Sequence, residues 1–164
     1  PFAILVAIGA EPILDQIESC LKAFGYQPGI PPQMGLGVTS CWVKESNLVL
    51  LGLGQFSRWA FWSELGLANA GTATEQLVGL GVPVISLPGK GPQFTRHFAL
   101  RQSRLLGGAV IPCSSAKKLV ERLQWLLNDA SLRKKLGAVG ERRMGGAGGS
   151  AALAKLVQKL LLEP

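Results

Sequence analysis

The stretch that decides the fold is Ala70–Leu106, which reads AGTATEQLVGLGVPVISLPGKGPQFTRHFALRQSRLL. A turn of small residues leads into a helical segment, and an apolar strand over 82–87 follows. A loop rich in glycine and proline then precedes a second helical segment over 95–106. Strands that alternate with helices predict a parallel sheet, in which ligands bind at the carboxyl ends of strands, beside the amino ends of the following helices.

The same alternation extends in both directions from this segment. Helical spacing of apolar residues over 13–24 is stopped by Gly25, an aromatic helix is expected over 56–65, and helical segments follow residue 116. Gln27–Gly37 reads as a loop. Buried strands are expected over 2–8, 38–43, 48–51, 67–70, 82–87 and 109–112. The pattern predicts an α/β fold with a doubly wound, mainly parallel sheet.

Composition narrows the class of protein. Of the 164 residues, 48% are hydrophobic and 16% charged, which is typical of a globular domain or of half of a two-domain enzyme. The net charge of +7 fits either a solvated helix face or a surface that meets an anionic partner. Neither a zinc-ligand spacing nor an RNA-binding motif is present, so we expect no metal site and no nucleic-acid partner.

Cysteine and histidine give little support to nucleophilic chemistry. The three cysteines, Cys20, Cys41 and Cys113, are scattered and read as small buried hydrophobes in a reducing compartment. His97 is the single histidine and lacks a Ser–His–Asp or metal set around it. The apolar start over 1–10 is too short for a membrane span and reads as a strand, and its abruptness suggests a chain cut from something longer.

The turn at Gly71 is the first candidate binding site. Small residues let a ligand approach the backbone, and free N–H groups at a helix start attract phosphate. Hydroxyls at Thr72 and Thr74 add donors, while Glu75 or Gln76 can accept hydrogen bonds from a sugar. A plain helix start, with Thr72 or Thr74 as N-cap, explains the same residues equally well.

The loop that ends at Thr95 is the second candidate. It also joins a strand to a helix, so it opens at the same edge of the predicted sheet as the turn at Gly71. Gln93 and Thr95 can reach a sugar or diphosphate, and Lys90 can pair with phosphate. The alternative is a capped loop with Thr95 as N-cap.

Five short stretches carry a resemblance to a known family: GQF at 54–56, AGTATEQ at 70–76, GLGVPVISLPGKGPQFT at 79–95, QSRLLG at 102–107 and RRMG at 142–145. Together they resemble the lipid-A-disaccharide synthases, and more closely a related cyanobacterial family. The likeness runs from Phe2 to the last helical segment. It implies the Rossmann-like C-terminal half of a glycosyltransferase B fold, which binds a nucleotide sugar, usually a UDP-sugar. The acceptor site and catalytic base then belong to an N-terminal domain.

The resemblance also assigns roles to residues. It places Gly71, Thr72 and Ala73 at the diphosphate, and Gln55 and Phe56 near the base. Where the family has a ribose-binding glutamate, this chain has Gln76, preceded by Glu75, so the bidentate carboxylate is missing or shifted. The residues implied to line the sugar or diphosphate are Gln93, Phe94 and Thr95, and Gly89 of the same loop is a further candidate for binding the nucleotide sugar.

We therefore expect residues 1–164 to form one nucleotide-sugar-binding domain, shortened at its N-terminus and inactive without the acceptor domain. The expected partners are the nucleotide-sugar donor, that acceptor domain and an anionic membrane surface, with self-association of the isolated chain. The expected location is cytoplasmic and peripheral to the inner membrane. No cofactor is expected, and no catalytic residue is assigned. The alternatives are a sugar-nucleotide epimerase-like enzyme and a non-catalytic interaction module on the same fold.

Overall fold

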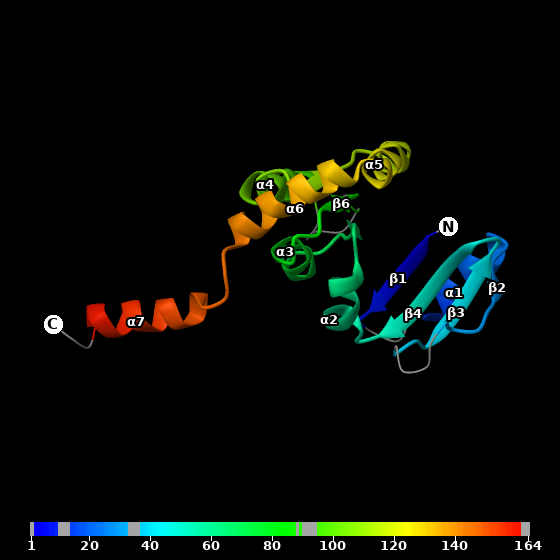
Figure 1. Ribbon diagram of the computed structural model, residues 1–164, viewed down its shortest axis with the longest axis horizontal. Coiled ribbons are helices and arrows are strands. Elements are labelled where there is room, and N and C mark those ends of the chain that lie inside the picture. The colour runs from blue at the N-terminus through cyan, green and yellow to red at the C-terminus, as the bar shows by residue number, and fades with distance from the viewer. Residues whose placement is uncertain (1, 10–13, 33–36, 88, 90–94, 162–164) are drawn as a thin grey trace. The chain divides into compact units, whose positions relative to one another are not determined.

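The computed structural model describes residues 2–9, 14–32, 37–87, 89 and 95–161, and the chain divides into two units. Unit 1 is Pro1–Trp62 and unit 2 is Ser63–Pro164. Figure 1 shows strands β1–β4 in unit 1, and β6 with most of the helices in unit 2.

Unit 1 is built on a four-stranded sheet with the order β1-β4-β3-β2 among its described residues. β1 runs parallel to β4, whereas β4–β3 and β3–β2 are antiparallel. The sheet is therefore mixed. β3 and β4 are antiparallel because the turn at Glu45 (φ +54°) that joins them is too short for the crossover that a parallel pair needs. The bounds are β1 Ala3–Ile8, β2 Gln27–Pro28, β3 Ser40–Lys44 and β4 Asn47–Leu53.

The strands predicted over 2–8, 38–43 and 48–51 are thus confirmed, while β2 lies inside the segment predicted to be a loop. Helix α1 (Leu14–Ala23) packs Leu14, Ile17 and Leu21 against a core of Ile8, Trp42, Val49 and Leu51. It ends at Ala23, and Gly25, whose φ is +81°, lies in the turn that stops it, as the sequence predicts.

A second core in unit 1 gathers around Trp59, which is buried with Cys41 and Leu50. Gly52 lies under the Trp59 ring, where a Cβ would overlap the indole. The aromatic helix predicted over 56–65 is shorter than expected. Helix α2 is Phe56–Trp59, and a 3-10 turn, η2, continues over Ala60–Trp62.

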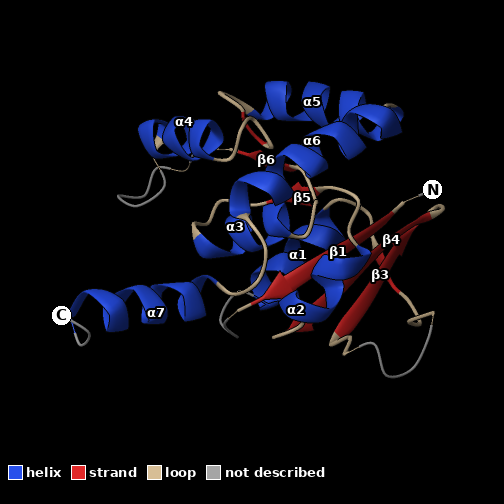
Figure 2. Cartoon of the chain, turned by 60° about the vertical axis from the view of Figure 1, so that its left-hand side comes forward, coloured by secondary structure: helices blue, strands red, loops and turns tan. Residues whose placement is uncertain are grey.

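Unit 2 contains a fully parallel sheet with the order β5-β6-β7 in its described part, and Figure 2 shows helices around these strands. Helices α3 and α4 make the two crossovers. Gly66 of β5 aligns with Val84 of β6, which aligns with Val110 of β7. The bounds are β5 Gly66–Leu67, α3 Thr72–Gly79, β6 Val84–Ser86, α4 Arg96–Leu105 and β7 Val110–Pro112.

The alternation read from Ala70–Leu106 is therefore confirmed as β5-α3-β6-α4-β7, although the strands are shorter than predicted. The strands follow one another in the sheet, so the reversal of strand order that defines a doubly wound sheet does not occur among them. The fold is α/β with a parallel sheet in this unit.

Three helices follow the sheet of unit 2: α5 Ala116–Asn128, α6 Ala130–Met144 and α7 Gly149–Leu161. Buried Ile85 of β6 packs with Leu126 and with partly buried leucines of α5 and α6. Helix α6 packs against α3 through glycines: a Cβ at Gly137 would overlap the Gly81 carbonyl oxygen, and one at Gly140 would meet Val78.

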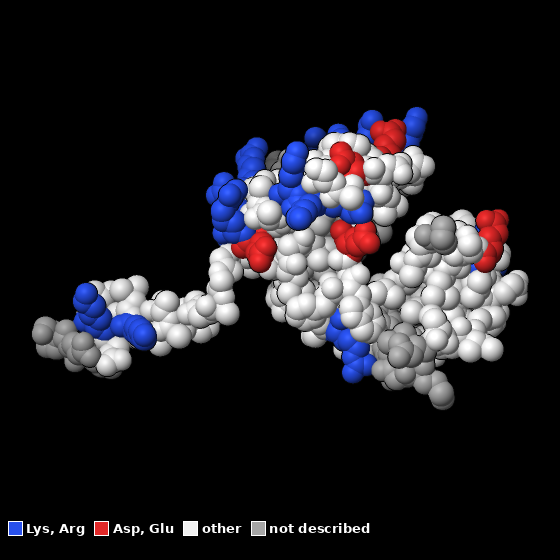
Figure 3. Space-filling model, viewed as in Figure 1, with Lys and Arg blue, Asp and Glu red and all other residues white. Residues whose placement is uncertain are grey.

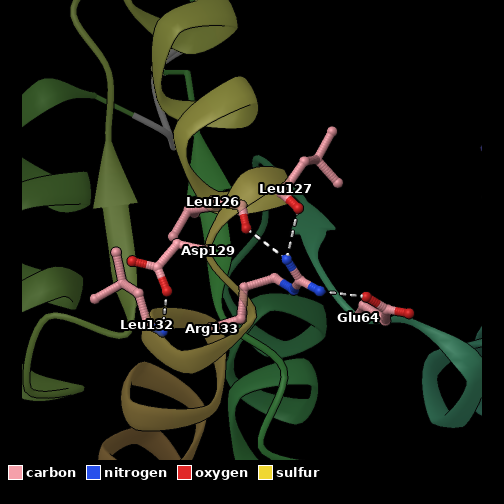
Figure 4. Close-up of polar contacts among 6 residues, drawn as sticks. All are labelled: Glu64, Leu126, Leu127, Asp129, Leu132 and Arg133. Atoms are coloured by element: carbon pink, nitrogen blue, oxygen red, sulfur yellow. Dashed lines mark hydrogen bonds and ion pairs between the residues drawn. The ribbon is translucent and has the colours of Figure 1, made fainter.

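The corner between α5 and α6 is fixed by Arg133, as Figure 4 shows. Its Nη1 donates to the carbonyl oxygens of Leu126 (2.6 Å) and Leu127 (2.9 Å), at the carboxyl end of α5. Its Nη2 pairs with Glu64 Oε2 at 2.6 Å, and Asp129 caps α6 by accepting from Leu132 N. A cation at a helix carboxyl end is electrostatically favourable.

Candidate functional site

The carboxyl edge of β5–β6–β7 brings three helix starts into one region of unit 2. Thr95 caps α4, where its Oγ1 accepts from Phe98 N at 3.3 Å, and Ser115 caps α5 by accepting from Lys118 N at 3.3 Å. Helix α3 differs from both, since its N-cap is Gly71 and no side chain caps it. The capped-loop interpretation of Thr95 is therefore confirmed, and among the described residues no side chain caps the amino end of α3.

A side chain of α3 itself holds the turn that precedes the helix. Thr74 is fully buried, and its Oγ1 donates to the Ala70 carbonyl oxygen at 2.6 Å. That hydroxyl proton is thus directed into the protein. Thr72, by contrast, is exposed at the first position of α3. Of the two predicted hydroxyl donors, Thr72 is the one that the structure presents to solvent.

A residue of the next helix also holds this turn. Gln102 of α4 is 3% exposed, and its Nε2 donates to the carbonyl oxygens of Gly71 (3.3 Å) and Ala70 (3.5 Å). Its Oε1 is buried and has no hydrogen-bond partner among the described residues. A buried orphan acceptor is costly, so an apolar residue would suit this position better on stability alone.

Sequence reasoning missed Gln102, although a signal was present. Ala99, Gln102 and Leu106 are buried at the helical spacing of i, i+3 and i+7, which makes Gln102 a polar residue in an apolar stripe. Ser86 is a comparable case at the end of β6. Its Oγ is buried without a partner in the described part of the chain.

The predicted ribose residues lie on different sides of α3. Gln76 is exposed and stands four residues after exposed Thr72, so the two share one face of the helix. Glu75 is half-buried, and its N–H donates to the Gly71 carbonyl oxygen at 3.1 Å. Ala73, which follows Thr72 in the first turn of α3, is also half-buried. The exposed face at the start of α3 therefore carries Thr72 and Gln76.

The remaining predicted site residues are divided between the units. Gln55 and Phe56 belong to unit 1, where Gln55 Nε2 donates to the Leu53 carbonyl oxygen at 3.0 Å and Phe56 begins α2. In unit 2, Gly89 is exposed in the loop after β6, and Thr95 begins α4. Lys90, Gln93 and Phe94 lie outside the described residues.

The described part of unit 2 contains at least two hollows. A cavity of about 200 Å³ is lined by Leu67, Ala68, Asn69, Leu87 and Leu119, directly beyond β5 and β6. Asn69 Oδ1 closes part of it by accepting from Leu87 N at 2.8 Å. This volume is below the roughly 300–1,000 Å³ of a pocket that encloses a drug-sized ligand.

The larger hollow, about 560 Å³, lies away from the predicted site. It is lined by Gly79 at the carboxyl end of α3 and by Ala138, Glu141, Arg142 and Gly145–Ala147. A helix carboxyl end repels anions, so this hollow is a poor phosphate site despite its size. We therefore place the candidate site at the amino end of α3.

The three cysteine thiols differ in burial. Burial raises the pKa of the Cys41 and Cys113 thiols, and nearby Arg122 only partly offsets this effect at Cys113. Both thiols are thus protonated at neutral pH, in agreement with the prediction that they act as buried hydrophobes. Cys20 contradicts that prediction, since it is exposed on α1. No group of three His, Cys, Asp or Glu residues able to hold a metal occurs in the described chain.

The charge of the chain is concentrated in unit 2. It carries 14 of the 17 Lys and Arg residues but 6 of the 10 Asp and Glu residues, a net charge of +8. Figure 3 shows these basic side chains over the helices of unit 2. An anionic ligand approaching the amino end of α3 therefore meets a favourable field. None of the helices in the described segments is both long enough and apolar enough to cross a membrane.

Comparison with known proteins adds no assignment. No protein-family model and no curated protein matches this chain.

Proposed function

We propose that unit 2 binds the diphosphate of a nucleotide sugar, with UDP as the nucleotide, and that the chain is the donor-binding part of a glycosyltransferase. The observation that carries this proposal is the uncapped amino end of α3 directly after a parallel strand. Its first N–H groups lack an intrahelical acceptor, and the helix dipole adds positive potential there. A phosphate group satisfies both, as it does in many α/β proteins.

The small residues of the turn support the same ligand. Gly71 has a φ of −77°, so it is not needed for a left-handed backbone. Among the described residues, a Cβ there would meet only Phe98, at 3.9 Å. The absence of a longer side chain, rather than backbone freedom, is thus what keeps the helix start accessible to an anion.

The sugar hydroxyls of the nucleotide are assigned to the exposed face of α3. Gln76 stands one turn beyond Thr72 on that face, so a phosphate at the helix start leaves the ribose within reach of its amide. The amide oxygen can accept one hydrogen bond from the diol, where a carboxylate would accept two. Glu75 is less suited, because it is half-buried and lies about 100° around the helix.

Transfer of the sugar would need no metal in this scheme. The helix start and nearby N–H donors would stabilise the charge that develops on the leaving diphosphate. The acceptor and the catalytic base are not assigned to any residue of this chain.

The test is calorimetric titration of the 164-residue chain with UDP, GDP, ADP and UDP-sugars. We expect preferential UDP binding, retained in Gly71→Ala and lost in Gly71→Trp, because only the indole is large enough to cover the helix start. Both substitutions occur at a negative φ, so neither strains the backbone.

Two outcomes would contradict this proposal. If none of the nucleotides binds at millimolar concentration, the non-catalytic interaction module replaces this proposal. If UDP-sugar is epimerised in the absence of an acceptor, the epimerase-like alternative replaces the transferase.

A further inference from the structure

We infer that helix α7 is an interfacial anchor that binds the surface of an anionic lipid bilayer. Every residue of α7 is exposed, including the large apolar ones. Leu160 and Leu161 are 68% and 74% exposed. Exposure of such a face to water costs free energy, and no residue of α7 is buried against the described part of unit 2.

The apolar side chains of α7 form one continuous stripe. They recur at the spacing i, i+3, i+4, i+7 and i+8, which places them on one side of a helix. Lys155 and Lys159 lie on the other side, one turn apart. The stripe consists of Leu153, Leu156, Val157, Leu160 and Leu161.

Charge selects an anionic surface over a second copy of the chain. The two lysines are the only charged residues in Gly149–Leu161, and no acidic residue is present there. Two α7 helices packed stripe to stripe would leave both lysines on their outer sides, where a second copy offers them no partner, whereas anionic headgroups attract them within about one Debye length. A short helix with a leucine-rich face and a lysine-bearing face lies in the plane of a bilayer surface.

The connection before α7 lets the helix reach a surface. Gly145, Gly146, Gly148 and Gly149 occupy open space, where an added Cβ would meet no described residue within 4 Å. Arg142 and Arg143 are exposed immediately before this connection and extend the basic charge. Because α7 makes no buried contact in unit 2, substitutions in its stripe leave the core of that unit intact.

The experiment is co-sedimentation of the 164-residue chain with phosphatidylcholine vesicles, with and without phosphatidylglycerol. We expect binding to the anionic vesicles, weakened by added salt. Leu156→Asp should reduce binding by about tenfold or more, since a buried leucine is lost. Lys155→Gln and Lys159→Gln should each reduce it about fivefold, and only with anionic vesicles.

The matched control is Val120→Asp, which makes the same kind of change at a half-exposed position of α5. It should leave vesicle binding within about twofold of the unmodified chain, because only apolar side chains of α7 insert into the bilayer and Val120 belongs to α5. The inference is overturned if the chain ignores anionic vesicles, or if Leu156→Asp binds them as well as the unmodified chain. A concentration-dependent dimer that Leu156→Asp dissociates, without vesicle binding, would assign the stripe to a second copy instead.

Discussion

Replacing Gln102 by Met should separate the stability of unit 2 from its capacity to bind phosphate. The amide of Gln102 makes two long hydrogen bonds, 3.3 and 3.5 Å, to carbonyl oxygens that each have another donor. Ala70 O keeps Thr74 Oγ1, and Gly71 O keeps the N–H of Glu75. The loss of the two bonds should therefore cost only about 1 kcal/mol in total.

The same substitution removes a buried acceptor that has no partner in the described structure. Relief of such a group is worth about 1–3 kcal/mol, and Met fills a similar volume with an apolar chain. The free energy of unfolding should thus stay the same or rise by up to about 2 kcal/mol. Urea denaturation measures this change, with exposed Gln124→Met of α5 as the matched control.

Phosphate binding should change in the opposite direction. Without Gln102 the carbonyl groups of the turn are no longer tied to α4, so the N–H groups of α3 lose their fixed direction. We expect the UDP dissociation constant to rise about tenfold, or roughly 1.4 kcal/mol, while Gln124→Met leaves it unchanged. The reasoning is refuted if Gln102→Met destabilises the chain by more than about 1 kcal/mol. It is refuted as well if the unmodified chain binds UDP and the Gln102→Met variant binds it with the same affinity.

Three further predictions concern stability and reactivity. Gly137→Ala should destabilise the chain by about 2 kcal/mol or more in urea denaturation, because the new Cβ would overlap the Gly81 carbonyl oxygen and this outweighs the better helix propensity of alanine. Gly79→Ala should leave the stability unchanged, because among the described residues its Cβ would meet only Met144, at 3.6 Å. Equal stability of the two variants would contradict the packing of α6 on α3. Arg133→Met should lower the free energy of unfolding by about 2 kcal/mol, because the bonds to the carbonyl oxygens at the end of α5 are lost. Glu64→Gln should lower it by less than about 1 kcal/mol, since Glu64 is 75% exposed and the carbonyl bonds of Arg133 remain. Similar losses of stability in the two variants would show that the ion pair dominates. A thiol reagent at neutral pH should label Cys20 alone, because Cys41 and Cys113 are buried. The free energy of unfolding should fall as the pH rises above about 9, because the thiols ionise in the unfolded chain while the raised pKa keeps Cys41 and Cys113 protonated in the folded one. Rapid labelling of either buried thiol, or a free energy of unfolding that increases above that pH, would contradict their burial.

The parts of the fold that depend on local chemistry could be read from the sequence. Gly25 ends α1, a short turn joins β3 to β4, and Thr95 caps α4, because each depends on residues within a few positions. The alternation of β5, α3, β6, α4 and β7 was predictable for the same reason.

The parts that depend on distant residues could not be read in this way. Gln102 is separated by 31 residues from Gly71, so nothing near the turn marks it as the residue that holds the carbonyl groups. Cys20 lies about 100° around α1 from Leu21, which takes it off the face that packs on the sheet. The two-residue β2 is formed by pairing with β3 rather than by its own sequence, which contains Pro28.

The central claim is that the amino end of α3 receives the diphosphate of a nucleotide, and the most direct measurement is an amide nuclear magnetic resonance titration of the isotope-labelled chain. UDP should shift the N–H signals of Thr72 and Ala73 strongly, with smaller shifts at Gln76, whereas uridine, which lacks the phosphates, should leave the helix start unchanged. Equal shifts with uridine, shifts confined to the hollow beside Gly79 and Glu141, or no shifts with UDP at millimolar concentration would contradict the account.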